Sequence, residues 1–133
     1  MRIAVINATG NRDAPEYVKA LTGGMESMGH RVDIIDACAG DGRGLPGYEY
    51  IAAAVEGSFF GGKIPAALGV LLAGAGSLTG KKSAAFVREN GPFTAKALAR
   101  VMAVMEKEGM CVNWSDRIRN SAHAENLGKM IGN

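Results

Sequence analysis

With 133 residues, the chain is the size of one ordinary domain and is long enough to bury a single hydrophobic core. Hydrophobic residues make up 47% and charged residues 21% of the sequence, which is the composition of a globular protein. The formal net charge of +2 gives no electrostatic reason to expect a nucleic acid or an anionic membrane as the partner. The longest apolar stretch, at 64–76, is too short to span a bilayer, and the apolar run after Arg2 is too short for a signal peptide. We therefore expect a cytoplasmic protein.

The pattern of apolar residues predicts strands that alternate with helices. Short apolar runs predict the strands, and runs with apolar residues at spacings of three and four predict the helices. In chain order, the predicted elements are a strand at 3–6, a helix at 15–28, strands at 31–37 and 48–55, a helix at 65–75, a strand at 82–87, a helix at 94–108, a strand at 110–114 and a helix at 122–131. A glycine-rich loop at 38–47 separates the second and third strands.

Two of the predicted helices carry residues that mark their ends. Asp13 is a good N-cap for the first helix, and Glu16 completes a capping-box pattern with it. Gly29 is well placed to end that helix, and Gly109 to end the third.

Strands that alternate with helices predict an α/β fold, in which a mostly parallel sheet has helices on both faces. Crossover connections in such a sheet are right-handed, which leaves few possible topologies. No internal repeat, low-complexity tract or linker interrupts the sequence. We therefore expect one domain over residues 1–133.

Several residues that often carry chemistry lack the sequence partners that such chemistry needs. Cys38 and Cys111 are far apart, so we expect free, partly buried thiols and no disulfide framework. His30 and His123 have no partner at helical spacing, and no metal site is predicted. The sequence has no GxSxG motif and no nucleophile paired with a base, so no catalytic residue is assigned.

Two glycine-rich segments only imitate nucleotide-binding motifs. Residues 74–82 approach a P-loop, but Ala75 stands at the first glycine and Lys82 at the magnesium-binding Ser or Thr. That segment also follows a predicted helix and precedes a predicted strand, which is the reverse of the order that the motif requires. Residues 40–44 open no helix. We predict that both segments are ordinary turns.

The first loop combines features of an anion site with those of an ordinary turn. Its sequence NATGNRDA, at 7–14, leads from a strand into the amino end of a helix, where free backbone N–H groups and the helix dipole favour an anion. Gly10 allows the backbone to approach a ligand closely, Thr9 offers a hydroxyl and Arg12 offers a positive charge. Any connection from a strand to a helix also needs a glycine and a cap, so both interpretations stand at this point.

Three segments of the chain resemble the flavodoxin-like family. Residues 47–87 contain EGSFFGGKIP and GKK, which resemble the aromatic loop and the following turn in the middle of that family. ENGPFTAKALARVMAVMEKEGM at 89–110 and AENLGKMIG at 124–132 continue the resemblance in family order, over essentially the whole chain. Without an insertion in the fifth strand, the chain looks like a short-chain member. The resemblance implies an open, doubly wound sheet of five parallel strands in the order 2-1-3-4-5, with flavin mononucleotide (FMN) where the strand order reverses.

The resemblance also implies that three loops form the FMN site. The residues that match the phosphate loop are Asn7, Thr9, Gly10, Asn11 and Arg12. The loop that packs an aromatic ring on the flavin matches Gly57, Ser58, Phe59, Phe60 and Gly61, with Gly62 beside them. The third loop matches residues 88–93, where backbone groups would meet the pyrimidine edge of the flavin: Arg88, Glu89, Asn90, Gly91, Pro92 and Phe93. In such a site the protein binds and tunes the flavin, and the flavin performs the redox step.

The sequence departs from the family pattern within these loops. Asn7 and Arg12 replace two of the hydroxyl residues of the phosphate loop, although an amide and a guanidinium can also donate to a phosphate. Asp13 adds a negative charge beside them. Glu56 stands where the family has glycine, and Ser58 stands where it has proline. The first loop therefore keeps the outline of a phosphate cradle, with altered chemistry.

Three functions are consistent with the resemblance. The first, which we take as the working hypothesis, is an FMN-binding electron carrier that acts between redox partner proteins. The second is an NAD(P)H-dependent flavin or quinone reductase on the same fold. The third is a binding or regulatory module of this fold that holds no flavin. Fold alone does not decide among them.

Trp114, the one tryptophan of the chain, is predicted to end the fifth strand. That position would lie at the carboxyl edge of the sheet. The indole would then either line the site or pack under the following loop.

Overall fold

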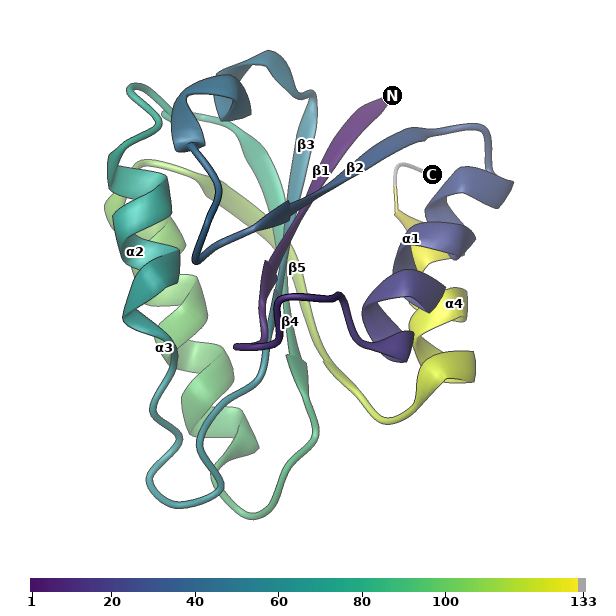
Figure 1. Cartoon of the computed structure of the whole chain (residues 1–133), viewed down its shortest axis with the longest axis vertical. Coiled ribbons are helices and arrows are strands. Elements are labelled where there is room, and N and C mark those ends of the chain that lie inside the picture. Colours follow the sequence, from purple (N-terminus) through teal and green to yellow (C-terminus); the bar gives the residue numbers. More distant parts are fainter. Residues whose placement is uncertain (132–133) are drawn as a thin grey trace.

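In the computed structural model, which describes residues 1–131, a parallel five-stranded sheet has the order β2-β1-β3-β4-β5 (Figure 1). The strands are β1 (Arg2–Ala8), β2 (Arg31–Asp36), β3 (Tyr50–Val55), β4 (Lys82–Arg88) and β5 (Cys111–Ile118). The helices are α1 (Glu16–Ser27), α2 (Ala66–Ala73), α3 (Thr94–Lys107) and α4 (Ser121–Met130), with a short 3-10 helix η1 (Gly42–Gly47). The predicted α/β class and strand order are confirmed.

Helices cover both faces of the sheet, with α2 and α3 on one side and α1 and α4 on the other (Figure 1). Successive residues of a strand point to opposite faces, so Ile51 and Ala53 pack with α2 and α3, whereas Ala52 and Ala54 pack with α1 and α4. All residues of β3 are buried because this central strand is covered on both sides. This burial on both faces explains why the sequence of β3 is a continuous apolar run, the pattern that predicted the strand.

Helices α1 and α4 pack closely through two glycines. A Cβ at Gly24 would overlap the main-chain carbonyl of Glu125, and a Cβ at Gly128 would overlap that of Leu21. Only glycine leaves room for such an approach of two helix backbones. Both helices start at the carboxyl edge of the sheet and run side by side (Figure 1). Their amino ends therefore face the same edge as the loops described below.

The predicted cap of the first helix is wrong. Helix α1 begins at Glu16 with Pro15 at its N-cap position, and no side chain caps it. Asp13 lies outside the helix, because the proline already fixes the backbone that leads into the first turn. The predicted end is correct: Gly29 has φ of +91°, and its N–H donates to the Glu26 carbonyl (3.0 Å).

Two other boundaries differ from prediction. The prediction that residues 40–44 form an ordinary turn and open no helix is wrong, because the 3-10 helix η1 begins at Gly42, where the Asp41 carboxylate caps it by accepting from the Arg43 N–H (2.9 Å). Strand β5 continues to Ile118, beyond the predicted end at Trp114, because its polar residues pair through their backbone with β4. Residues 74–81 form the turn before β4, as predicted, and Lys82 is the first residue of that strand. Within residues 1–131, no helix has the length and apolar character needed to cross a bilayer.

Gly24→Ala tests the packing between α1 and α4. The added Cβ would overlap the Glu125 carbonyl, so we expect the free energy of unfolding to fall by about 2 kcal/mol. Urea denaturation followed by circular dichroism measures the change. Gly23→Ala is the matched control in the same helix: nothing lies within 4 Å of its Cβ, and it should gain up to about 1 kcal/mol. Equal stability of the two variants would contradict the close packing.

Candidate functional site

Three loops leave the sheet at the carboxyl ends of β1, β3 and β4, at the lower edge in Figure 1. The first loop joins β1 to α1, the second joins β3 to α2, and the third joins β4 to α3. Strand order reverses between β1 and β3, because the chain passes from β1 to β2 on one side and then to β3 on the other. The residues predicted for the site therefore lie along one edge, at the position where open α/β sheets bind ligands.

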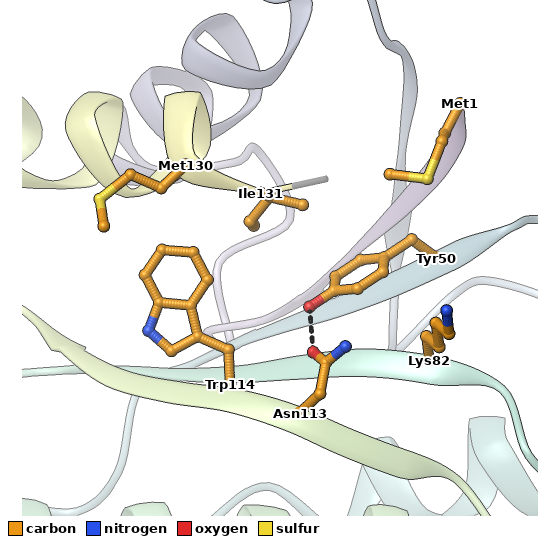
Figure 2. A pocket seen from close by; sticks show the side chains of 7 residues that line it. All are labelled: Met1, Tyr50, Lys82, Asn113, Trp114, Met130 and Ile131. Atoms are coloured by element: carbon orange, nitrogen blue, oxygen red, sulfur yellow. Dashed lines mark hydrogen bonds between the residues drawn. The ribbon is translucent and has the colours of Figure 1, made fainter. Parts of the chain in front are cut away.

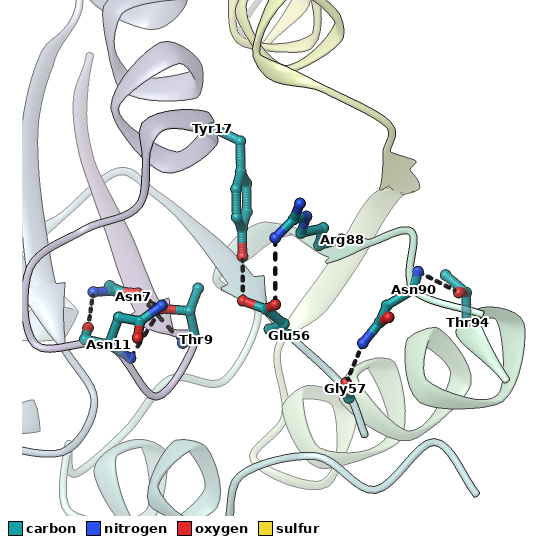
Figure 3. A network of polar contacts seen from close by, with 9 residues as sticks. All are labelled: Asn7, Thr9, Asn11, Tyr17, Glu56, Gly57, Arg88, Asn90 and Thr94. Atoms are coloured by element: carbon teal, nitrogen blue, oxygen red, sulfur yellow. Dashed lines mark hydrogen bonds and ion pairs between the residues drawn. The ribbon is translucent and has the colours of Figure 1, made fainter. Parts of the chain in front are cut away.

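The buried Asn7 side chain holds the first loop in its shape (Figure 3). Its Nδ2 donates to the Asn11 carbonyl (3.0 Å), and its Oδ1 accepts from the Thr9 hydroxyl (2.7 Å) and the Thr9 backbone N–H (3.3 Å). The Thr9 hydroxyl in turn accepts from the Asn11 N–H (3.3 Å). The polar side chains of Asn7 and Thr9 thus bond within the loop and form its internal frame.

The same frame leaves a run of backbone donors free. Within residues 1–131, no group accepts a hydrogen bond from the N–H groups of Gly10, Arg12, Asp13 or Ala14. Gly10 has φ of +85°, a conformation that glycine adopts readily. These donors come just before α1, and the positive end of the helix dipole adds to them. The Arg12 side chain pairs with no carboxylate in the described chain, so the loop can meet an anion with main-chain donors and one guanidinium.

A small hollow adjoins the first loop on the side of β2. Its volume is about 220 Å³, and it is lined by Gly10, Asn11, Arg12, Asp36, Cys38 and Ala39. The Cys38 N–H donates to the Asp36 carboxylate (2.9 Å), which offsets part of that negative charge.

Both cysteines are free but exposed, where partly buried thiols were predicted. Cys38 is exposed because it lies in the turn after β2, and Cys111 because it opens the edge strand β5.

The second loop is a tight turn that carries two aromatic rings. The Ser58 hydroxyl donates to the Phe60 carbonyl (2.8 Å), and the turn closes through Gly61 and Gly62, with φ of +82° and +66°. Positive φ at two successive positions favours glycine strongly. Phe59 and Phe60 lie edge to face, with ring centroids 4.9 Å apart. Phe60 is 78% exposed, so one large apolar ring faces solvent.

The third loop packs directly against the second. The Asn90 amide donates to the Gly57 carbonyl (3.3 Å), and the Asn90 N–H donates to the Thr94 hydroxyl (3.0 Å) at the start of α3 (Figure 3). Gly91 has φ of +74°, and the Phe59 ring lies so close to it that a Cβ there would overlap the ring. The hollow between these two loops is filled, with a volume of about 0 Å³.

A carboxylate lies between the first loop and the third. Glu56 follows β3, accepts a hydrogen bond from the Tyr17 hydroxyl (3.4 Å) and pairs with the Arg88 guanidinium (3.5 Å) (Figure 3). The Arg88 guanidinium lies over the Tyr17 ring, 5.5 Å from its centroid. Burial and then the negative charge of Glu56 raise the pKa of the Tyr17 hydroxyl, so Tyr17 remains a neutral donor. The three side chains tie α1 to the carboxyl ends of β3 and β4.

The structure arranges the predicted residues in two groups, the first loop alone and the second loop packed on the third. In the cluster of Tyr17, Glu56 and Arg88 between them, Arg88 was predicted as part of the third loop, whereas Tyr17 and Glu56 were not predicted as site residues. The one sign of this cluster in the sequence is the glutamate at a position where the resembled family has glycine. Of the remaining predicted residues, Glu89 is exposed, and Phe93 is the N-cap residue of α3.

Trp114 lies away from the three loops, and its predicted place at the carboxyl edge is wrong. Because β5 continues to Ile118, the indole sits within the strand, opposite Ala84. It packs edge to face on the buried Phe86, with ring centroids 5.9 Å apart. Trp114 therefore belongs to the face of the sheet that α1 and α4 cover.

Asn7→Ala tests the frame of the first loop. Removing the amide leaves the Asn11 carbonyl and the Thr9 donors without their partner, so we expect the free energy of unfolding to fall by about 2 kcal/mol. Thermal denaturation measures the loss. Asn11→Ala is the matched control, because Asn11 joins the frame through its backbone alone; it should stay within about 0.5 kcal/mol of the native chain. An Asn7 variant as stable as the control would contradict this role.

Solved flavodoxin structures resemble the chain over nearly its whole length. Two-electron reduced flavodoxin from Megasphaera elsdenii aligns with a TM-score of 0.79 and 12% identity, over 96% of each chain. Oxidised flavodoxin 1 from Bacillus cereus aligns with a TM-score of 0.75 and 16% identity, over 96% of this chain and 95% of the other. A flavodoxin from the domain Archaea aligns with a TM-score of 0.72 and 18% identity, over 98% and 96%. No family model and no curated protein matches the sequence. The likeness shows that the chain has the flavodoxin-like fold, as the resemblance predicted.

Proposed function

We propose that the protein binds FMN at the three loops and carries electrons between redox partner proteins. One observation above all supports this proposal. The backbone N–H groups of Gly10 and of residues 12–14 have no partner within residues 1–131, and they lie in the loop that leads into the amino end of α1, beside the point where the strand order reverses. Free main-chain donors at a helix amino terminus form the common binding arrangement for a phosphate. The structural neighbours named above are flavodoxins, which makes a flavin phosphate the natural candidate.

The first loop fits a phosphate through its main chain. The side chains of Asn7 and Thr9 shape the loop, so the donors for a phosphate would be the free N–H groups and the Arg12 guanidinium. A guanidinium can bind two phosphate oxygens at once, which adds both strength and orientation. The free N–H groups and the Arg12 guanidinium would therefore take the place of the hydroxyl residues with which the family binds phosphate.

The second and third loops fit the flavin ring. The exposed Phe60 ring offers an apolar face that a flat aromatic group can cover. In the third loop, the Gly91 N–H, which has no partner within residues 1–131, would meet the polar edge of the ring, because the Glu89 N–H donates to the Ile118 carbonyl (2.8 Å) and the Asn90 N–H to the Thr94 hydroxyl (3.0 Å). When bound, the flavin supplies the electron chemistry; the residues of this chain bind it, orient it and shield one of its faces.

A second function is favoured by a different contact. The Phe59 ring lies against Gly91, and the hollow lined by residues of the second and third loops has a volume of about 0 Å³. While Phe59 stays in contact with Gly91, no flavin ring enters between those two loops. The protein would then be a binding module without flavin. The two functions predict opposite results in an FMN titration.

Titration of FMN with the protein, followed by flavin fluorescence, tests the proposal. We expect saturable quenching at micromolar FMN. Arg12→Ala should weaken binding about tenfold, because it removes a charge-assisted contact to the phosphate. Phe60→Ala should also weaken binding, through lost ring contact. Lys19→Ala is the control: Lys19 is exposed on α1, so this variant removes the same charge away from the loops and should change little.

Two results would contradict the FMN proposal. One is a colourless purified protein that leaves FMN fluorescence unchanged, which would favour the module without flavin. The other is equal weakening by Arg12→Ala and Lys19→Ala, which would mean that the first loop has no special role.

A further inference from the structure

A second cavity lies at the amino edge of the sheet, opposite the edge that carries the three loops (Figure 2). Its volume is about 570 Å³, within the range of sites that bind small molecules. Tyr50 and Lys82 border it, and they are the first residues of β3 and β4. None of its lining residues belongs to the three loops.

Apolar groups form most of the cavity's surroundings. Figure 2 shows the Trp114 indole and the Tyr50 ring on the side of the sheet, with Met130 and Ile131 from the end of α4 above them. Met130 is 56% exposed although it is a large apolar residue. Two aromatic rings and a flexible thioether suit a flat aromatic ligand.

A β-bulge brings two neighbouring residues of β5 to this cavity. Ser83 pairs with Val112, whereas the next residue, Ala84, pairs with Trp114, so Asn113 is an extra residue in β5. In a regular strand, neighbouring side chains point to opposite faces. Here both Asn113 and Trp114 line the cavity (Figure 2). Bulges commonly redirect side chains next to functional sites.

Several hydrogen-bond donors that line the cavity have no acceptor within residues 1–131, although the Tyr50 hydroxyl has one. The Tyr50 hydroxyl donates to Asn113 Oδ1 (2.8 Å), and burial raises the pKa of Tyr50 to about 12, so the hydroxyl remains a donor. That bond turns the Asn113 oxygen toward Tyr50 and leaves the amide nitrogen available. Within residues 1–131, nothing accepts from Asn113 Nδ2, Trp114 Nε1 or Lys82 Nζ. Among residues 1–131, no acidic residue lines the cavity.

We propose that this cavity binds a small planar aromatic anion of the aromatic carboxylate class. The ring lies between Trp114 and Met130, and the carboxylate meets the Asn113 amide and the Lys82 ammonium. A carboxylate supplies the acceptors that these donors lack, and its negative charge is opposite to the positive charge of Lys82. The site is independent of FMN, because it lies at the other edge of the sheet.

Titration with 2-naphthoate, followed by ¹⁵N–¹H correlation spectra of the protein as purified, tests this proposal. The chain has one tryptophan, so its indole N–H gives a single resonance that reports on the cavity. We expect saturable shifts of that resonance and of the Asn113 side-chain amide. No saturable shift at millimolar 2-naphthoate would overturn the proposal. Saturable shifts confined to the first-loop amides would overturn it too, because they would place the ligand at the other edge.

Paired variants and a neutral ligand separate the contribution of the ligand's charge to binding from that of its aromatic ring. Lys82→Ala should weaken 2-naphthoate about fivefold, as expected for a partly exposed ion pair, and leave the neutral 2-naphthamide unchanged. Asn113→Ala should weaken both ligands, because both present a carbonyl oxygen to the amide. Lys96→Ala is the control: Lys96 is exposed on α3, and its loss should affect neither ligand. Equal effects of Lys82→Ala and Lys96→Ala on 2-naphthoate would overturn the role of Lys82.

Discussion

The hydrogen bonds of one buried amide set the shape of the first loop at the carboxyl edge of the sheet. Asn7 is the last but one residue of β1, and a buried amide must find partners for its oxygen and its nitrogen. It finds them in Thr9 and Asn11, which bends the chain back on itself directly after the strand. Within residues 1–131, the N–H groups of Gly10, Arg12, Asp13 and Ala14 have no partner, and they belong to the loop beside which the strand order reverses. The side chains of Asn7 and Thr9 keep the shape of the loop, and these backbone donors stay free.

The charges along this edge divide the site into two ends. At the first loop, the Arg12 guanidinium and the dipole of α1 supply positive charge, against the negative charge of Asp13. Glu56 then places a carboxylate between that loop and the aromatic loops, partly balanced by Arg88 at 3.5 Å. Because a negative charge disfavours further negative charge nearby, Glu56 opposes the build-up of negative charge on a group bound beside it.

Sequence patterns predicted the elements that depend on burial. The apolar runs gave β1 and β3 because these strands are covered on both faces, and glycine marked the ends of α1 and α3. The end of β5 was missed because its polar residues pair through the backbone, and the side-chain pattern does not report backbone pairing. The cap by Asp13 was wrong because Pro15 already fixes the entry to the helix.

The site was predicted less completely than the fold, for a related reason. The three loops followed from the resemblance, but the contacts among them join residues that are distant in sequence. Tyr17, Glu56 and Arg88 come from three different elements, and the contact of Phe59 with Gly91 joins two loops. Such contacts depend on how the elements pack, and no local spacing encodes them.

The central claim is that the backbone of the first loop binds a phosphate. The most direct test compares FMN with riboflavin, which lacks the phosphate, in ¹⁵N–¹H correlation spectra. We expect FMN to shift the amide resonances of Gly10, Arg12, Asp13 and Ala14 in a saturable way, and riboflavin to leave them in place. If FMN left these amides unshifted, or if riboflavin shifted them equally, the phosphate-binding role of the loop would be contradicted.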